Sequence, residues 1–227
     1  MERKLWKKYS NAIKDIDLTK SYSPSEAFEI IKKTSYSKFD GSVEVSIKTS
    51  ANPKYNDQMI RSTVVLPNWT WKIVRVAAFV SDDKVEEAKK SWADIAWNES
   101  LLKDIQSWKM DFDSLVTTQD MMRDLAKVAK VLWPRGLMPS PKAGTVTNDL
   151  SATIDEIKKW RVEFKLDKTW NIHAILWKVS FDESKLVENL DALVKAINDA
   201  KPSWVKWKLI SRVVVSPTMW PWVEVSI

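Results

Sequence analysis

The chain has 227 residues, which is long enough for one or two domains with hydrophobic cores. It has no cysteine and one histidine, His173, which excludes disulfides, thiolate catalysis, cysteine-based zinc sites and histidine metal clusters. The 36 Lys and Arg outnumber the 30 Asp and Glu, and the pI near 9.3 mildly favours anionic partners. Neither a signal peptide nor an apolar run of membrane-spanning length occurs, so we expect a cytoplasmic protein with no membrane partner.

Glycine and tryptophan have unusual counts, three and fourteen. Glycine ordinarily makes up about 7% of a protein. Three glycines fall far short of this share, whereas the glycines and tryptophans together reach it. Fourteen tryptophans could stack on single-stranded nucleic acid or lie at a membrane interface. Trp69, Trp71, Trp133 and Trp220 instead stand at turn and cap positions, where positive φ favours glycine. We therefore favour an exchange of glycine for tryptophan over a stacking surface.

The N-terminal third predicts a helix followed by two strands. Ser23 and Glu26 have the spacing of a capping box, so a helix is expected to begin there. Residues 42–48 alternate apolar and polar side chains, which is typical of a strand with one wet face. Residues 61–66 predict a second strand, which Pro67 ends.

The middle of the chain has a different pattern. Residues 73–80 form a nearly continuous apolar run, as expected for a strand that is covered on both faces. Helical patterns at residues 83–91, 101–107 and 120–132 and a strand pattern at residues 112–116 follow, and this alternation indicates a small parallel α/β unit. Residues 134–147 contain three prolines and two glycines without periodicity, and predict an ordered loop.

Alternation with one wet face returns in the last third, after a predicted helix at residues 150–159. The further predicted elements are strands at 162–166, 173–181, 205–216 and 223–225 and an amphipathic helix at 182–200. Because both ends of the chain share this pattern, we predict an α+β domain from residues 1–66 plus 161–227. An α/β domain, residues 67–160, is inserted in it.

Sites for catalysis or metal binding are weakly indicated. Asp111 and Asp113 could hold a hard metal ion, but a solvated or loop-capping pair is the interpretation we favour. Lys72 could belong to a phosphate loop, yet the glycine spacing of such a loop is missing. His173 lies in an apolar strand and is expected to be packed or hydrogen-bonded. The alternative is that the chain is an α/β enzyme that binds a phosphorylated ligand in the inserted domain. We predict no catalytic residue, metal or cofactor.

Basic residues near the strands of the outer domain favour RNA binding. Lys38 and Phe39 precede the strand whose wet face carries Ser42, Glu44, Ser46 and Lys48, and the other half of the domain adds Lys168, Lys178, Lys206 and Lys208. Contacts to phosphate need Lys and Arg, and Phe39 offers a surface for stacking or fitting a base. A charged strand face can also be merely solvated.

Several motifs resemble those of the ribosomal protein L-one family, the protein of the mobile stalk beside the tRNA exit site. The resemblance covers essentially the whole chain. The residues that carry it are Lys38–Asp40, Val43–Glu44, Leu66–Pro67, Met110–Asp113, Pro134–Pro139, Pro141–Lys142, Gly144–Thr147, Thr218–Met219 and Pro221. It implies a split β-α-β outer domain with an inserted Rossmann-like domain.

The resemblance also implies the partners and the site. The outer domain would bind the stalk of the large-subunit ribosomal RNA through Lys38, Phe39, Ser42, Glu44, Asp167, Lys168, Thr218, Met219 and Trp220. Ser42 departs from the family, which usually has Thr there. The loop residues Pro134, Arg135, Gly136, Lys142 and Gly144 are expected to brace the region between the domains. The other partners that the resemblance implies are exit-site tRNA and the protein's own mRNA, whose translation it would repress. The protein would be a monomer within the ribosome.

The tryptophans are the systematic departure from the family. All fourteen fall where the family has, or readily tolerates, glycine; Trp69, Trp71, Trp133, Trp177 and Trp220 are the clearest cases. Where the family often has tryptophan, before the Asp-Phe-Asp stretch, this chain has Lys109. Our hypothesis is that the source organism reads the codon UGA as glycine, whereas the written sequence translates it as tryptophan.

Overall fold

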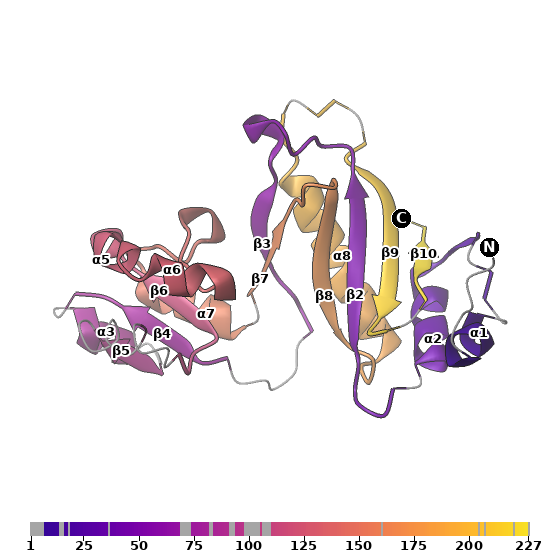
Figure 1. The fold of residues 1–227 in the computed structure, drawn as a ribbon, viewed down its shortest axis with the longest axis horizontal. Coiled ribbons are helices and arrows are strands. Elements are labelled where there is room, and N and C mark those ends of the chain that lie inside the picture. Colours follow the sequence, from indigo (N-terminus) through magenta and orange to yellow (C-terminus); the bar gives the residue numbers. More distant parts are fainter. Residues whose placement is uncertain are drawn as a thin grey trace. The chain divides into compact units, whose positions relative to one another are not determined.

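The structure is a computed structural model, and it divides into two compact units. Unit 1 comprises Met1–Asn68 and Val162–Ile227, and unit 2 comprises Trp69–Arg161. The residues that the structure describes are 7–13, 16–17, 19–35, 37–68, 74–81, 84–90, 94–97, 105, 110–159, 161–203, 205–206, 208–219 and 221–226. The mixed α/β class expected from the sequence is confirmed, and helices and sheets occur in both units (Figure 1).

Unit 1 is built around one five-stranded sheet with the order β1-β10-β9-β2-β8. Its strands are β1 (Ser21–Tyr22), β2 (Ser42–Thr49), β8 (Asn171–Lys178), β9 (Ile210–Pro217) and β10 (Val223–Val225). All neighbours are antiparallel except β1 and β10. A separate pair joins β3 (Arg61–Val65) to β7 (Arg161–Lys165). The helices are α1 (Lys7–Ile13), α2 (Pro24–Thr34), the short η1 (Asn56–Gln58) and α8 (Glu183–Asp199).

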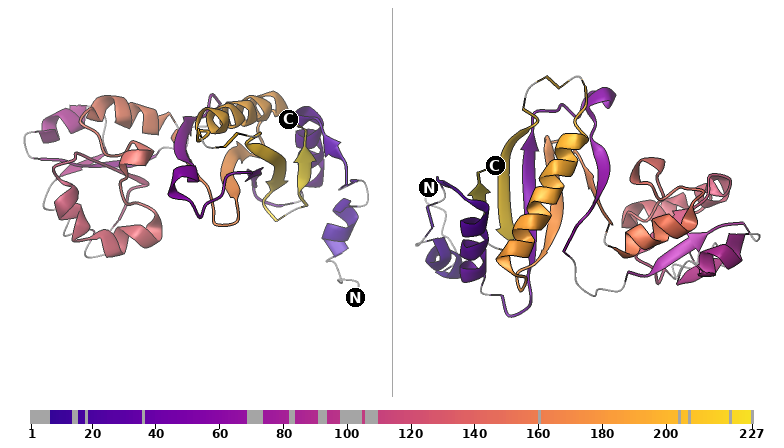
Figure 2. Two further views of the ribbon diagram at one scale, coloured as in Figure 1. Left: turned by 90° about the horizontal axis from the view of Figure 1, so that it is seen from above. Right: turned by 180° about the vertical axis from the view of Figure 1, so that it is seen from behind.

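Helices cover one face of the five-stranded sheet. The apolar side chains that alternate along β2, Val43, Val45 and Ile47, are fully buried. Buried residues of the neighbouring strands and of α2 and α8 also belong to this core, and Figure 2 shows α8 lying along the sheet. The capping box expected at α2 is present: the Ser23 hydroxyl accepts from the Glu26 N–H and holds the pKa of Glu26 below its ordinary value.

Unit 2 contains a three-stranded parallel sheet in the order β5-β4-β6. Its strands are β4 (Val76–Phe79), β5 (Ile95–Trp97) and β6 (Ser114–Thr117). Its helices are α3 (Val85–Lys90), α5 (Met122–Ala126), α6 (Ala129–Leu132), η3 (Trp133–Arg135), η4 (Pro141–Ala143) and α7 (Leu150–Lys158). Every residue of β4 is buried.

The core of unit 2 lies on both faces of β4. Ala77 and Phe79 pack into a cluster with α5 and α6 side chains such as Leu125 and Leu132. Val76 and Ala78 belong to a second cluster, which includes the α7 side chains Leu150, Ile154 and Ile157. This arrangement confirms the prediction that the apolar run forms a strand covered on both faces.

Three element predictions were wrong in extent. The strand expected at residues 173–181 is β8, Asn171–Lys178, and a turn follows it. The helix expected at residues 120–132 is split into α5 and α6, because Val128 has φ −107° and ψ 6° and leaves helical geometry. The strand expected to begin at residue 205 begins at Ile210. The backbone carbonyls of Lys208 and Leu209 accept hydrogen bonds from Ser50 instead of continuing the ladder. Most of the helix expected at residues 101–107 lies outside the described residues.

A fully buried amide fixes the end of unit 1's first segment. The Asn189 side chain, in α8, accepts a hydrogen bond from the Asn68 N–H at 3.0 Å and donates to the Asn68 carbonyl at 2.9 Å. It also donates to the Leu176 carbonyl at 3.0 Å. This one side chain therefore satisfies three backbone groups, and it holds the residue after which the chain passes into unit 2.

The described tryptophans differ in backbone geometry. Trp170 has φ +67°, in the left-handed region, and is the one tryptophan among the described residues with a positive φ. Trp133 has φ −60° inside η3, so the expectation of a left-handed cap there was wrong. The left-handed residue that ends this turn is Gly136, with φ +70°. Trp177 is a buried strand residue, and Trp69, Trp71 and Trp220 lie outside the described residues.

Candidate nucleic-acid interface

The face of the five-stranded sheet opposite the core is polar. We call it the open face, and define it by Ser42, Glu44, Ser46 and Lys48 of β2, His173, Ile175 and Lys178 of β8, Arg212 and Ser216 of β9, and Glu224 of β10. The pairing register places Glu44 between Ile175 and Ser216, and Ser46 beside His173. The alternation seen in the sequence is thus a real separation of core side chains from exposed ones.

At one end of the open face, two distant segments meet. The Thr218 hydroxyl accepts a hydrogen bond from the Ser42 N–H at 2.9 Å, and the Thr218 N–H donates to the Ser42 carbonyl at 2.9 Å. We call the described residues 37–42 together with 218 and 219 the junction. Two large side chains are exposed there, Phe39 at 57% and Met219 at 81%. The two segments that these bonds join contain five of the predicted contact residues: Lys38, Phe39, Ser42, Thr218 and Met219.

β8 and the turn after it reinforce the junction. The Lys178 ammonium donates to the Ser42 hydroxyl at 3.0 Å and to the Asp40 carbonyl at 3.4 Å. The Asp40 carboxylate accepts from the Ser180 hydroxyl at 2.7 Å and from the Ser180 N–H at 3.2 Å. The loop that carries Lys38 and Phe39 is thereby held by side chains as well as by the backbone.

Asp167 and Lys168 lie at the opposite end of the sheet, in the turn between β7 and β8. The Asp167 carboxylate accepts from the Thr169 hydroxyl at 2.9 Å and from the Lys168 N–H at 2.6 Å. These two hydrogen bonds, the hydroxyl first, hold the pKa of Asp167 below its ordinary value. β2 runs from Ser42, beside the junction, to Lys48, which pairs with the first residue of β8. At about 3.3 Å per residue the two ends are roughly 20 Å apart.

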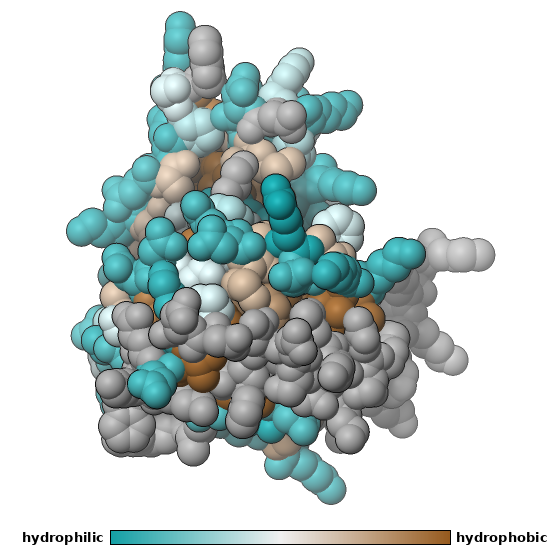
Figure 3. Space-filling model, turned by 90° about the vertical axis from the view of Figure 1, so that its left-hand side faces the viewer, coloured by the Kyte–Doolittle hydropathy of each residue, from teal (hydrophilic) through white to brown (hydrophobic). Residues whose placement is uncertain are grey.

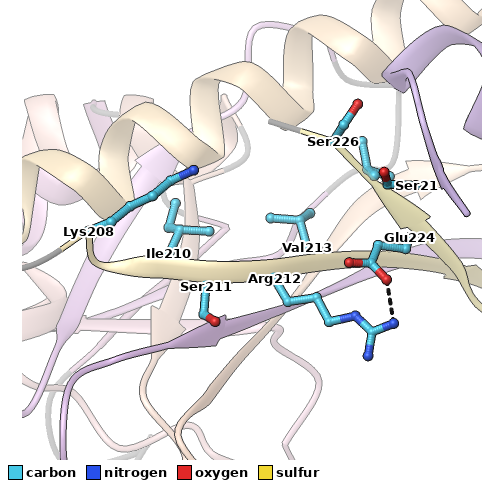
Figure 4. Close-up of a pocket in the computed structure, with 9 residues that line it drawn as sticks. Ser21, Lys208, Ile210, Ser211, Arg212, Val213, Glu224 and Ser226 are labelled. Carbon is cyan, nitrogen blue, oxygen red and sulfur yellow. Dashed lines mark hydrogen bonds and ion pairs between the residues drawn. The ribbon is translucent and has the colours of Figure 1, made fainter.

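The middle of the open face carries further polar pairs. The Ser46 hydroxyl and His173 Nδ1 are 3.0 Å apart, so His173 is hydrogen-bonded but exposed, not packed in an apolar strand. Arg212 forms an ion pair with Glu224, and both belong to a shallow pocket at β9 and β10 (Figure 4). The Arg212 guanidinium also lies 5.0 Å from the centre of the Trp222 ring.

Unit 2 places the predicted loop residues in two tight turns. Gly136 and Gly144 are left-handed, with φ +70° and +63°, and each ends a short 3-10 helix. A Cβ on Gly144 would come within 2.2 Å of the Arg161 guanidinium, so the loop packs against that side chain. Pro134 and Arg135 are exposed, and the Lys142 side chain is outside the described part. Within unit 2 this geometry fits a bracing loop.

The alternative sites gain no support from the described residues. The Asp113 carboxylate accepts from the Arg75 N–H at 3.1 Å, so it caps a loop as favoured. The described part of the chain contains no group of three His, Asp or Glu placed to hold a metal ion. Lys72 lies outside the described residues. None of the helices in the described ranges combines the length and apolarity needed to cross a bilayer. Among the residues that are coloured in Figure 3, hydrophilic side chains outnumber the apolar ones, which form small patches.

Sequence reasoning missed three parts of this surface. Arg212 and Glu224 come from strands that read only as apolar alternation, and their ion pair depends on the register of β9 and β10. Asp40 was noted only as part of a motif, and its bond to Ser180 joins residues 140 positions apart. The signal that could have found Arg212 is its exposed place in the alternation of β9.

These features define a mixed α/β protein whose exposed sheet face combines cations, hydroxyls and carboxylates, with the exposed aromatic ring of Phe39 at the junction. Cations and aromatic rings are groups that proteins use to contact phosphates and bases. Residues 31–221 match the ribosomal protein L1p/L10e family, and the chain belongs to this family. Similar proteins named large ribosomal subunit protein uL1 occur in Kosmotoga olearia, Thermosipho melanesiensis and Mycolicibacterium vanbaalenii. They are 45%, 44% and 43% identical over 220, 221 and 220 residues, covering 97% of this chain and 95%, 95% and 94% of the relatives. The resemblance found in the sequence is thereby confirmed.

Proposed function

We propose that this chain is a structural protein of the large ribosomal subunit that binds the ribosomal RNA of the mobile stalk. Its family membership and the names of its relatives support a ribosomal role. The finer roles that the resemblance implies are assistance to deacylated tRNA as it leaves the exit site and repression of the protein's own mRNA. The chain acts as a monomer within the ribosome and without catalysis.

The two units have separate roles in this proposal. An α+β domain of the split β-α-β type, residues 1–66 plus 161–227, binds the RNA, and an inserted Rossmann-like domain, residues 67–160, is carried on it. The polar open face of unit 1 and the separation of the chain into two compact units support this division. The proposed RNA contacts are Lys38, Phe39, Ser42, Glu44, Asp167, Lys168, Thr218, Met219 and position 220.

The observation that carries the proposal is the junction. Ser42 and Thr218 are 176 residues apart in the chain, yet three hydrogen bonds join them at 2.9, 2.9 and 3.2 Å. This arrangement fixes the exposed Phe39 and Met219 before any partner binds. A fixed surface loses little conformational entropy on binding, so it favours a folded RNA of defined shape.

The position of Asp167 and Lys168 agrees with a large ligand. They lie roughly 20 Å along the sheet from the junction, which is too far for one base or phosphate to touch both. Glu44, Ser46 and His173 line the space between the two ends. An RNA that contacts both ends must follow the open face along β2, as a folded stalk can.

Equilibrium binding tests the proposal. We expect tight binding to a fragment of the stalk RNA and to the similar mRNA structure, and weak binding to a hairpin of scrambled sequence. The slope of log affinity against log salt should be about −0.9 per duplex phosphate contacted.

Thr218→Val should weaken stalk binding about tenfold, because it removes a hydroxyl that joins the two segments of the junction. Thr153→Val, which removes a hydroxyl bonded to Asp149 in unit 2, is the matched control and should bind normally. Equal affinity for the scrambled hairpin, or affinity that ignores salt, would refute stalk recognition.

A further inference from the structure

Trp170 occupies a backbone position that favours glycine. It ends the turn between β7 and β8, where the Asp167 N–H donates to the Asn171 carbonyl at 2.8 Å and the Trp170 N–H donates to the Asp167 carbonyl at 3.1 Å. These bonds enclose a three-residue loop whose last residue, Trp170, has φ +67°. This is the hairpin in which a left-handed residue forms a G1 bulge, and glycine is the usual residue there because a Cβ strains that conformation.

The chain has few glycines for the left-handed positions that it contains. Among the described residues four have a positive φ: Gly136, Gly144, Trp170 and Met219. The chain has three glycines where about 16 would be usual at about 7%. Its fourteen tryptophans make up the difference, since three plus fourteen is 17 of 227 residues. The reading of a single codon can produce this exchange. If an organism reads UGA as glycine and its genes are translated with a code that reads UGA as tryptophan, every such glycine is written as tryptophan.

We propose that the source organism decodes UGA as glycine, so that the functioning chain carries glycine at the fourteen positions written as tryptophan. Glycine at position 170 removes the strained Cβ from the hairpin turn. The written glycines, Gly41, Gly136 and Gly144, come from ordinary glycine codons. Trp97, Trp133, Trp177 and Trp222 have no positive φ, so composition and not backbone strain assigns these four positions, as it does the nine tryptophans outside the described residues.

The exchange changes the candidate RNA surface. The Trp222 ring lies against the Arg212 guanidinium on the open face, so glycine at position 222 leaves that side of Arg212 free for a phosphate. Position 220, which directly follows Met219 of the junction in the sequence, is among the fourteen positions. This effect on RNA affinity rests on the proposed function, whereas the decoding itself does not.

The intact mass of the protein purified from the source organism tests the proposal. We expect a mass below that of the written chain by fourteen Trp-to-Gly differences, and UGA codons at all fourteen positions. The tryptic peptide of residues 169–178, which holds positions 170 and 177, should sequence with two glycines. A mass equal to that of the written chain, a peptide with tryptophan at either position, or UGG codons at these positions would overturn it.

A second arm separates this proposal from the function. Two synthetic genes encode the chain with glycine or with tryptophan at the fourteen positions, and both products are tested on the stalk RNA fragment. Tighter binding by the glycine chain, by tenfold or more, is expected. If the native mass shows glycine but neither chain binds the stalk RNA, the decoding stands and the proposed function fails. If the native mass shows tryptophan, the decoding fails whatever the RNA result.

Discussion

The strain at position 170 can be measured by replacing Trp170 with glycine and, separately, with alanine. Both replacements remove the same indole ring, so the difference between the two variants isolates the backbone. Trp133 is the matched control, because it is also exposed but has φ −60° inside a 3-10 helix. The same pair of replacements there removes the same side chain from a backbone that any residue adopts.

The expected difference has opposite signs at the two positions. A Cβ in the left-handed region costs about 1–2 kcal/mol, and the greater freedom of glycine in the unfolded chain offsets about 0.4–1 kcal/mol of that. Trp170→Gly should therefore be more stable than Trp170→Ala by about 0.8 kcal/mol, the difference between the midpoints of these two ranges. In the 3-10 helix no strain is relieved, so Trp133→Ala should be more stable than Trp133→Gly by about 0.5–1 kcal/mol.

Urea unfolding followed by circular dichroism gives these differences from the midpoints, provided that the slopes of the four variants agree. Hydrogen exchange at the amides of residues 167–171 locates the change in the turn between β7 and β8. The reasoning is refuted if alanine matches or exceeds glycine at position 170, or if glycine is favoured equally at both positions.

Three further predictions concern unit 1. Asn189→Leu should lower the free energy of unfolding by about 3 kcal/mol, because it leaves one buried and two part-buried backbone groups without this partner; an unchanged urea midpoint would contradict the role given to this amide. Thr169→Ala should raise the pKa of Asp167 toward its ordinary value, as measured by NMR titration, and an unmoved pKa would contradict the assignment of cause. Because the folded pKa of Asp167 is lowered, its stabilisation of the turn is present above the ordinary carboxyl range near pH 4 and is lost as the pH falls through the lowered pKa. Lys168→Gln removes the charge of an exposed side chain among the proposed contacts, so it should weaken binding to the stalk RNA and reduce its salt slope by about 0.9; an unchanged slope would show that Lys168 contacts no phosphate.

Local signals in the sequence predicted local structure well. The capping box at Ser23 and Glu26 depends on residues three apart, and it forms as expected. The apolar run around β4 predicted burial on both faces, because only a covered strand lacks polar positions. The break of the 120–132 helix at Val128 was missed, since its apolar spacing continues past the break.

Parts of the site that depend on long-range pairing could not be read from the sequence. The bond between Ser42 and Thr218 needs the register of β2 and β9, which a pattern of alternation leaves open. The left-handed turn at position 170 was hidden for another reason: tryptophan there gives no turn signal, whereas glycine would have marked the hairpin. The resemblance supplied the proposed contact residues. The structure places seven of them in two groups near opposite ends of β2, with Glu44 between the groups and Trp220 outside the described residues.

The most direct test of the RNA-binding claim is site-specific cross-linking in the assembled large subunit. A photoreactive side chain is placed at position 39 or 219, where the present side chains are exposed, and at Ser151 of unit 2 as the control. Cross-links from positions 39 and 219 should map to the stalk of the large-subunit RNA, and those from position 151 should not. Cross-links from 39 and 219 to another part of the RNA, or to protein alone, would contradict the proposed interface.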